Sequence, residues 1–169
     1  MSTASLVPVE EYLATHYRPD CDYIDGEVRG RSMGEYDHGR LQGLLFAWFL
    51  RHEKEWKIRV VVEQRVRISP TRYRIPDVCV ISSDAVEQVI SKPPLLCVEI
   101  LSPDDSLNSM QERIDDYFAL GVPCVWVLNP RTKRAWVYTA EGSREARDGV
   151  LRAADAAIAL PVAEVFEGE

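Results

Sequence analysis

The segment Leu95-Leu96-Cys97-Val98-Glu99-Ile100-Leu101 is the most apolar strand-like segment of the chain, and Glu99 is its one charged residue. A nearly continuous apolar run is typical of a strand that is buried on both faces of a sheet. A carboxylate on such a strand loses its hydration and needs compensation from a metal ion, from an arginine or lysine, or from backbone donors. The segment therefore predicts a buried central strand. It leaves open whether Glu99 serves a functional site or an internal salt bridge.

A second carboxylate, Asp77, stands near the start of another apolar strand, which we predict over residues 74–81. If this strand lies beside the strand of Glu99, the two carboxylates converge, and their charges repel each other unless a cation lies between them. Oxygen ligands of this kind suit Mg²⁺ or Mn²⁺. The alternative for Asp77 alone is a structural carboxylate at a turn or at the start of a strand.

A strong helix is predicted over residues 36–53, because the apolar residues of this segment fall on one broad face of the helical wheel. His38 lies near the start of that face. It is either a histidine at the boundary of the core or a member of a site.

A further helix is predicted over residues 109–120, with Ser109 and Glu112 as its capping box and Gly121 as its end. Arg113 falls inside the apolar stripe of this helix. An arginine in such a position normally meets a carboxylate. The alternative is an aliphatic stem that lies on the surface with its charged group in water.

The rest of the chain alternates between short apolar segments and turns. We predict a short helix at 7–17, a hairpin at 22–29, a half-buried strand at 58–68, and a hairpin made of strands 124–128 and 133–138. Beyond Ala140 the pattern weakens, and one or two edge strands are expected. This order predicts an α/β fold in which helices pack on a mixed sheet. The length of 169 residues indicates one domain, 1–169, with a core at about residues 7–140.

The composition narrows the classes of function. A net charge of −7 argues against a protein that grips nucleic acid through a broad basic surface. It is compatible with a nuclease, because bound divalent cations and local arginine clusters offset negative charge. The four cysteines lack metal-type spacing and indicate small buried residues in a reducing compartment. Without an apolar run of membrane-spanning length or a signal-peptide pattern, we expect a soluble cytoplasmic protein with no membrane partner.

Several motifs occur together in an order that resembles one protein family. They are Tyr23-Ile24-Asp25-Gly26-Glu27-Val28, His38-Gly39-Arg40, Ile75-Pro76-Asp77-Val78, Cys97-Val98-Glu99-Ile100-Leu101-Ser102-Pro103, Gly121-Val122-Pro123 after Tyr117, and Asn129-Pro130 after Trp126. The set resembles the Uma-type restriction endonucleases of bacteria, which belong to the PD-(D/E)XK nuclease superfamily. The resemblance spans about residues 7–138. It implies a restriction-endonuclease-like mixed β-sheet flanked by helices, hydrolysis of phosphodiester bonds in DNA, and the dimeric state that is common in families of this fold.

The resemblance also implies roles for individual residues. Asp77 and Glu99 would hold Mg²⁺ or Mn²⁺, and with Arg113 and His38 they form the candidate catalytic set. The usual lysine of the motif would stand at Leu101, which is apolar, and the matching position on the following helix is Arg113. Arginine stays protonated and cannot act as a general base, although it can orient water or stabilise negative charge. Further candidates for the border of the site are Gln64 and Glu27.

Three interpretations remain open at this point. The chain is a metal-dependent nuclease acting on DNA, or a weakly active or inactive relative that serves as a binding module, or a domain in which Arg113 neutralises Glu99 without a metal. The arginine at position 113 and the net charge favour the second interpretation, whereas the presence of both acidic residues favours the first.

Overall fold

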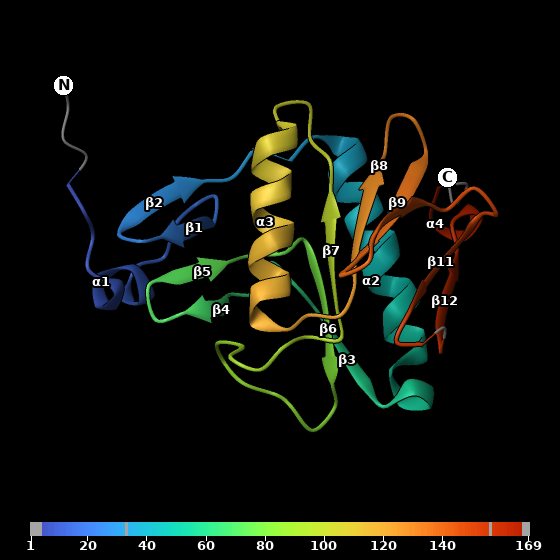
Figure 1. Cartoon of the computed structure of the whole chain (residues 1–169), viewed down its shortest axis with the longest axis horizontal. Helices are drawn as coiled ribbons and strands as arrows, with labels where there is room; N and C mark the ends of the chain where they lie inside the picture. Colours follow the sequence, from blue (N-terminus) through green and yellow to red (C-terminus); the bar gives the residue numbers. More distant parts are fainter. Residues whose placement is uncertain (1–4, 33, 156, 167–169) are drawn as a thin grey trace.

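The structure is a computed structural model that describes residues 5–32, 34–155 and 157–166 (Figure 1). The helices are α1 (Val9–Ala14), α2 (Tyr36–Trp56), α3 (Leu107–Leu120) and α4 (Ala163–Phe166). The strands are β1 (Cys21–Ile24), β2 (Glu27–Gly30), β3 (Ile58–Val62), β4 (Val66–Ser69), β5 (Arg72–Arg74), β6 (Val78–Ser82), β7 (Leu96–Ile100), β8 (Val125–Asn129), β9 (Arg134–Thr139), β10 (Gly142–Glu145), β11 (Val150–Ala153) and β12 (Ile158–Pro161). Within these ranges, no helix has the length and apolarity needed to span a membrane.

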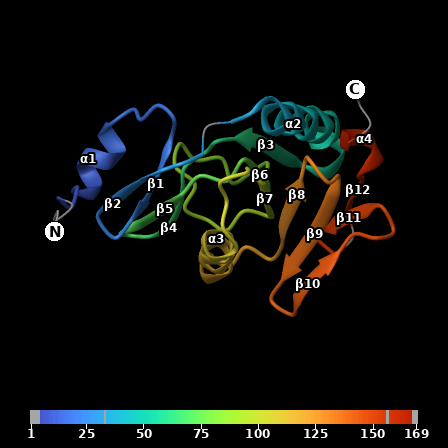
Figure 2. The same cartoon turned by 90° about the horizontal axis from the view of Figure 1, so that it is seen from above.

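The central sheet has six strands in the order β10-β9-β8-β7-β6-β3. Its neighbours are antiparallel except β7 and β8, which are parallel. Helices α2 and α3 lie on opposite sides of this sheet (Figure 2). Every residue of β7 is buried, as its apolar sequence predicts. The predicted mixed sheet flanked by helices is confirmed.

Alternate residues of the central strands face the two helices. Val98 belongs to the core cluster that contains the apolar face of α2, whereas Cys97 packs in the cluster that contains Met110 and Ile114 of α3. Because successive side chains of a strand point to opposite faces, Glu99 lies on the α3 side together with Cys97.

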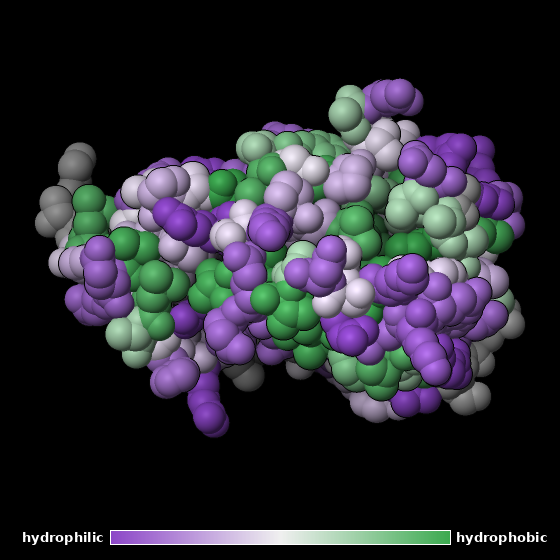
Figure 3. Space-filling model, turned by 90° about the horizontal axis from the view of Figure 1, so that it is seen from below, coloured by the Kyte–Doolittle hydropathy of each residue, from purple (hydrophilic) through white to green (hydrophobic). Residues whose placement is uncertain are grey.

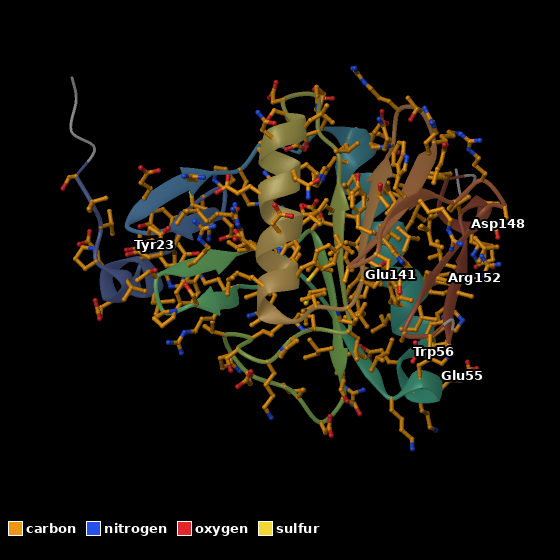
Figure 4. All side chains as sticks on the ribbon, in the orientation of Figure 1. Tyr23, Glu55, Trp56, Glu141, Asp148 and Arg152 are labelled. Atoms are coloured by element: carbon orange, nitrogen blue, oxygen red, sulfur yellow. The ribbon has the colours of Figure 1, made fainter. Side chains whose placement is uncertain are left out.

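A smaller antiparallel sheet, β2-β1-β5-β4, extends the molecule toward the N-terminus. It holds a cluster of tyrosines in which Tyr12 of α1 stacks on Tyr23 of β1, with ring centroids 4.8 Å apart. Figure 4 shows Tyr23 at this end of the long axis and Asp148 and Arg152 at the other. The predicted hairpin around Asp25-Gly26 is confirmed as the pair β1–β2.

Two of the predicted strands are wrong, because each divides into two strands in different sheets. Residues 58–68 form β3 in the central sheet and β4 in the small sheet, with a break at Glu63, whose φ is 50°. Residues 74–81 divide between β5 and β6. Pro76 lies at this second break, where it has no N–H to donate to a strand ladder.

Other boundaries also differ. Helix α3 begins earlier than predicted, because Ser106 is its N-cap and forms the capping box with Ser109 in place of the predicted pair Ser109 and Glu112. Gly121 ends α3 as predicted, with φ of 106° in the left-handed region. Beyond Ala140 the chain is more ordered than its pattern indicates, since β11, β12 and α4 add Leu151, Leu160 and other apolar residues to the main core.

Seen from below, the surface carries separate hydrophobic patches among hydrophilic residues (Figure 3). Scattered apolar residues are ordinary on a protein surface, so these patches by themselves indicate no partner.

Candidate functional site

The register of β6 and β7 places Asp77 and Glu99 opposite each other. Val78 of β6 pairs with Val98 of β7, so the next position outward brings Asp77 to Glu99. Directly opposed residues of antiparallel strands share a face, with Cβ atoms about 4.5–5.5 Å apart. Both side chains are buried, with relative exposures of 2% and 0%. The two predicted acidic residues therefore meet at one end of the central sheet.

Asp77 is surrounded by donors. Its Oδ1 atom is paired with the guanidinium of Arg31 and lies 3.4 Å from Nε2 of His38, and its Oδ2 atom accepts the N–H of Ile100 at 2.7 Å. The side-chain amide of Gln42 donates to the backbone carbonyl of Asp77 at 2.9 Å. Burial alone would raise the pKa of Asp77, but the hydrogen bond from His38 and the charge of Arg31 outweigh burial and lower this pKa. Asp77 is therefore a fixed negative charge.

The pKa of His38 is shifted in the opposite direction from that of a histidine affected by burial alone. Burial would lower its pKa, but the hydrogen bond with Asp77 and the charge of Asp77 raise it above the usual value. His38 is half-buried and lines a pocket.

The pKa of Glu99 is shifted upward, whereas that of Asp77 is shifted downward. The Oε1 atom of Glu99 accepts the hydroxyl of Tyr117 at 2.5 Å, and its Oε2 atom lies 3.4 Å from Nη1 of Arg113. Burial and then the negative charge of Asp77 raise the pKa of Glu99 to about 7, and the charge of Arg113 opposes this shift only in part. The site thus joins a carboxylate that stays ionised to one that changes charge near neutral pH.

Arg113 points toward the site from α3. Besides Glu99, it meets Asp105 of the β7–α3 loop, with Nη2 3.5 Å from Oδ1. Asp105 in turn accepts the N–H of Ser102 at 2.8 Å. Arg113 therefore ties α3 to the buried carboxylate and to the loop that follows β7.

A pocket of about 440 Å³ opens over these groups. Its walls include Asp77, His38, Arg113, Arg31 and Asp105, whereas Glu99 lies beneath them without exposed surface. The walls carry both signs of charge. A ligand with a phosphate group would meet two arginines there, close to two acidic side chains.

The geometry includes residues that the sequence analysis did not select. They are Arg31, which pairs with Asp77, and Tyr117, whose hydroxyl donates to Glu99. Tyr117 follows Arg113 by one helical turn, and this spacing was the available signal for it. Two weaker candidates are wrong, since neither belongs to the walls of the pocket: Gln64 donates to the carbonyl of Gln88 at 2.6 Å, and Glu27 pairs with Arg29.

The donor set fits a cation that keeps water or phosphate ligands. In the described part of the chain, no group of three or more His, Cys, Asp or Glu residues is placed to hold a metal ion. Asp77 and Glu99 alone supply two carboxylates, which is the number that Mg²⁺ commonly takes from a protein when substrate phosphate completes its shell. Burial and then the negative charge of Asp77 raise the pKa of Glu99, and a cation between the two carboxylates would relieve their repulsion. Arg31 and Arg113 supply that compensation in this structure.

A buried ion-pair network holds α3 against the small sheet. Arg74 of β5 donates to Asp116 of α3 at 2.6 Å and to Asp22 of β1 at 3.0 Å. Its remaining nitrogen, Nη2, lies 3.2 Å from Glu112 without hydrogen-bond geometry. Asp22 also accepts the N–H of Ile75, two residues before Asp77. The network thus fixes α3, which carries Arg113, relative to the segment that carries Asp77.

Comparisons with known proteins identify the family and a similar fold. The model of the Uma2 family, described as "Putative restriction endonuclease", matches residues 9–167. The fold is similar to that of a solved structure described as a "putative nuclease belonging to DUF820" from Anabaena variabilis ATCC 29413. The two share 19% sequence identity and a TM-score of 0.83, over 95% of this chain and 98% of that chain. A search of curated proteins finds no match.

Proposed function

The chain belongs to the Uma2 restriction endonuclease family, and from this premise we propose that it is a divalent-metal-dependent nuclease that hydrolyses phosphodiester bonds of DNA. The observation that carries the proposal is the pair of buried carboxylates, Asp77 and Glu99, opposed across β6 and β7 beneath a charged pocket. Burying two acidic residues side by side is costly unless cations offset their charges, and a divalent metal ion between them would offset both.

In this proposal the residues around the pocket have separate roles in catalysis. Asp77 and Glu99 would hold Mg²⁺ or Mn²⁺, which when bound supplies an activated water and stabilises the departing oxygen. Arg113 and Arg31 would contact the phosphate and offset its charge, since guanidinium groups match phosphate geometry. His38, whose pKa is raised by Asp77, would give a proton to a group in the pocket. Tyr117 holds Glu99 in its orientation.

A second candidate function has its own support. Arg31 is paired with Asp77 and Arg113 with Glu99, so the chain already balances both acidic residues with its own cations. Such a domain would keep the nuclease fold as a binding module with little or no catalysis. Arg113 supports this candidate further, because it cannot act as a general base.

The deciding experiment measures metal binding and cleavage together. Wild type, Glu99→Ala and the control Glu141→Ala, which removes an exposed glutamate of the β9–β10 turn, are incubated with plasmid and with single-stranded DNA, with and without Mg²⁺ or Mn²⁺. Calorimetry measures the binding of each metal to the same three proteins. The nuclease proposal expects metal-dependent cleavage and metal binding by wild type and Glu141→Ala, and loss of both in Glu99→Ala. Absence of cleavage and of metal binding in wild type would leave the binding module.

A further inference from the structure

A second pocket, of about 540 Å³, opens beside the first one. The two pockets share His38, Ser102 and Asp105 as walls, so the second pocket adjoins the space over Asp77. The volume lies within the range of about 300–1,000 Å³ that is typical of small-ligand sites. A ligand with two chemically different ends could therefore occupy both pockets.

The floor of the second pocket is aromatic. Trp136 pairs with Val127, which pairs in turn with Glu99, so these three side chains share the α3 face of the central sheet. Tyr138 follows two residues later on the same face. Helix α3 leaves both rings half-exposed, and they line the pocket. The strand register thus carries one continuous face from the buried carboxylates to two aromatic rings.

The facing wall is apolar as well. Met110 and Leu107 of the first turns of α3 line it, and Leu107 is 91% exposed. A leucine with that exposure beside two half-exposed rings contributes little to the core and is available for contact with a flat apolar ligand.

Charges at the rim separate the second pocket from the first. Glu35 and Asp37 of the α2 start are exposed carboxylates that outnumber Arg131 on the wall of the second pocket, whereas Asp105 is already paired with Arg113. Exposed carboxylates disfavour a phosphate there, but their oxygens accept hydrogen bonds from the amino groups of nucleobases. The charged first pocket and the aromatic second pocket match the two ends of a nucleotide.

We propose that the second pocket binds one unpaired nucleobase, stacked on Trp136 and Tyr138, next to the phosphate at Asp77 and Glu99. This inference rests on the proposed nuclease function and specifies the substrate as single-stranded or locally unpaired DNA. A base inside a duplex is already stacked and cannot enter a side pocket without leaving the helix. Aromatic side chains stack on any base, so the pocket selects for unpairing and tolerates different sequences.

The test is a binding measurement in EDTA, where metal-dependent cleavage cannot occur, repeated with Ca²⁺. Fluorescence polarisation compares a labelled single-stranded oligonucleotide with the same sequence as a duplex. The variants are Trp136→Leu, Tyr138→Leu and the control Trp56→Leu, which removes an indole outside both pockets, at the far end of α2 (Figure 4). Thermal unfolding checks that each variant is folded.

Wild type and Trp56→Leu are expected to bind the single strand more tightly than the duplex. Trp136→Leu and Tyr138→Leu should each weaken binding to the single strand by about tenfold, in line with the loss of one base-stacking contact. Duplex binding should change little. Equal affinity for the two forms in wild type, no measurable binding, or unchanged affinity in both pocket variants would overturn the inference.

The outcomes separate this inference from the nuclease proposal. Binding that depends on Trp136, combined with absence of cleavage under any metal, would keep the base pocket and remove the nuclease. Metal-dependent cleavage that is lost in Glu99→Ala but unaffected by Trp136→Leu and Tyr138→Leu would keep the nuclease and remove the base pocket.

Discussion

Replacing Glu99 by glutamine tests whether ionisation of this buried carboxyl group destabilises the folded protein. Glutamine has nearly the same shape, and its carbonyl can still accept the hydroxyl of Tyr117. Glutamine never ionises, so at this position only wild type acquires a negative charge as pH rises. The informative quantity is therefore the change with pH of the difference in unfolding free energy between Glu99→Gln and wild type.

The expected size follows from the pKa of Glu99, which is raised from 4.5 to about 7 in the folded protein. Below pH 4.5 the carboxyl group is protonated in both states, and its burial carries no ionisation penalty. Between pH 4.5 and about 7 the unfolded state releases its proton while the folded state keeps it, so wild type loses stability as pH rises. Above about 7 the penalty levels off. One pKa unit corresponds to about 1.4 kcal/mol, so the penalty approaches about 3 kcal/mol at pH 8 and is under about 1 kcal/mol at pH 5.

Urea unfolding followed by tryptophan fluorescence at pH 5, 6, 7 and 8 measures this difference. Glu99→Gln should gain about 2–3 kcal/mol relative to wild type between pH 5 and pH 8. The loss of stability from His38, whose raised pKa also makes stability fall as pH rises, occurs in both proteins and largely cancels. Glu141→Gln, at an exposed position, is the matched control and should show almost no such gain. A flat difference for Glu99→Gln would show that Glu99 is ionised at neutral pH without penalty, and the electrostatic account of the site would fail.

Three other changes test the remaining structure. Arg113→Lys should leave the fold intact. If the arginine weakens a nuclease, this substitution should raise Mg²⁺- or Mn²⁺-dependent nicking of DNA, because a lysine near a metal can transfer protons. If Arg113 is only a partner of Glu99, unfolding measurements should show lower stability and nicking should not rise. Arg74→Met should cost about 3–5 kcal/mol in urea unfolding, because it leaves buried Asp22 without its cation, although Asp116 keeps its pair with Arg72. Arg152→Met, which breaks an exposed pair, should cost under about 1 kcal/mol. Ser106→Ala should cost about 1 kcal/mol by removing the N-cap of α3; an unchanged stability would contradict the observed capping box.

Local apolar patterns were sufficient for much of the fold. The run around Glu99 predicted the buried strand β7, and the wheel of residues 36–53 predicted the helix that became α2. These patterns succeed because burial of a strand or of a helix face is recorded in the spacing of apolar residues. The same patterns did not reveal the breaks at Glu63 and Pro76. The strands on either side of each break have buried residues and the apolar pattern continues across it, so each pair of strands was predicted as one.

The candidate site also combines features that the sequence predicts with features that depend on the tertiary structure. The sequence by itself determined that Glu99 needs a compensating partner and that Arg113 falls within the apolar stripe of its helix, because both follow from the apolar residues around them. Only the tertiary structure decided which side chains contact Asp77 and Glu99. The register of β6 and β7 set Asp77 opposite Glu99, and Arg31 reached Asp77 across 46 positions of sequence. Register and long-range pairing depend on how whole strands and helices pack together, and a local pattern of residues contains no record of that packing.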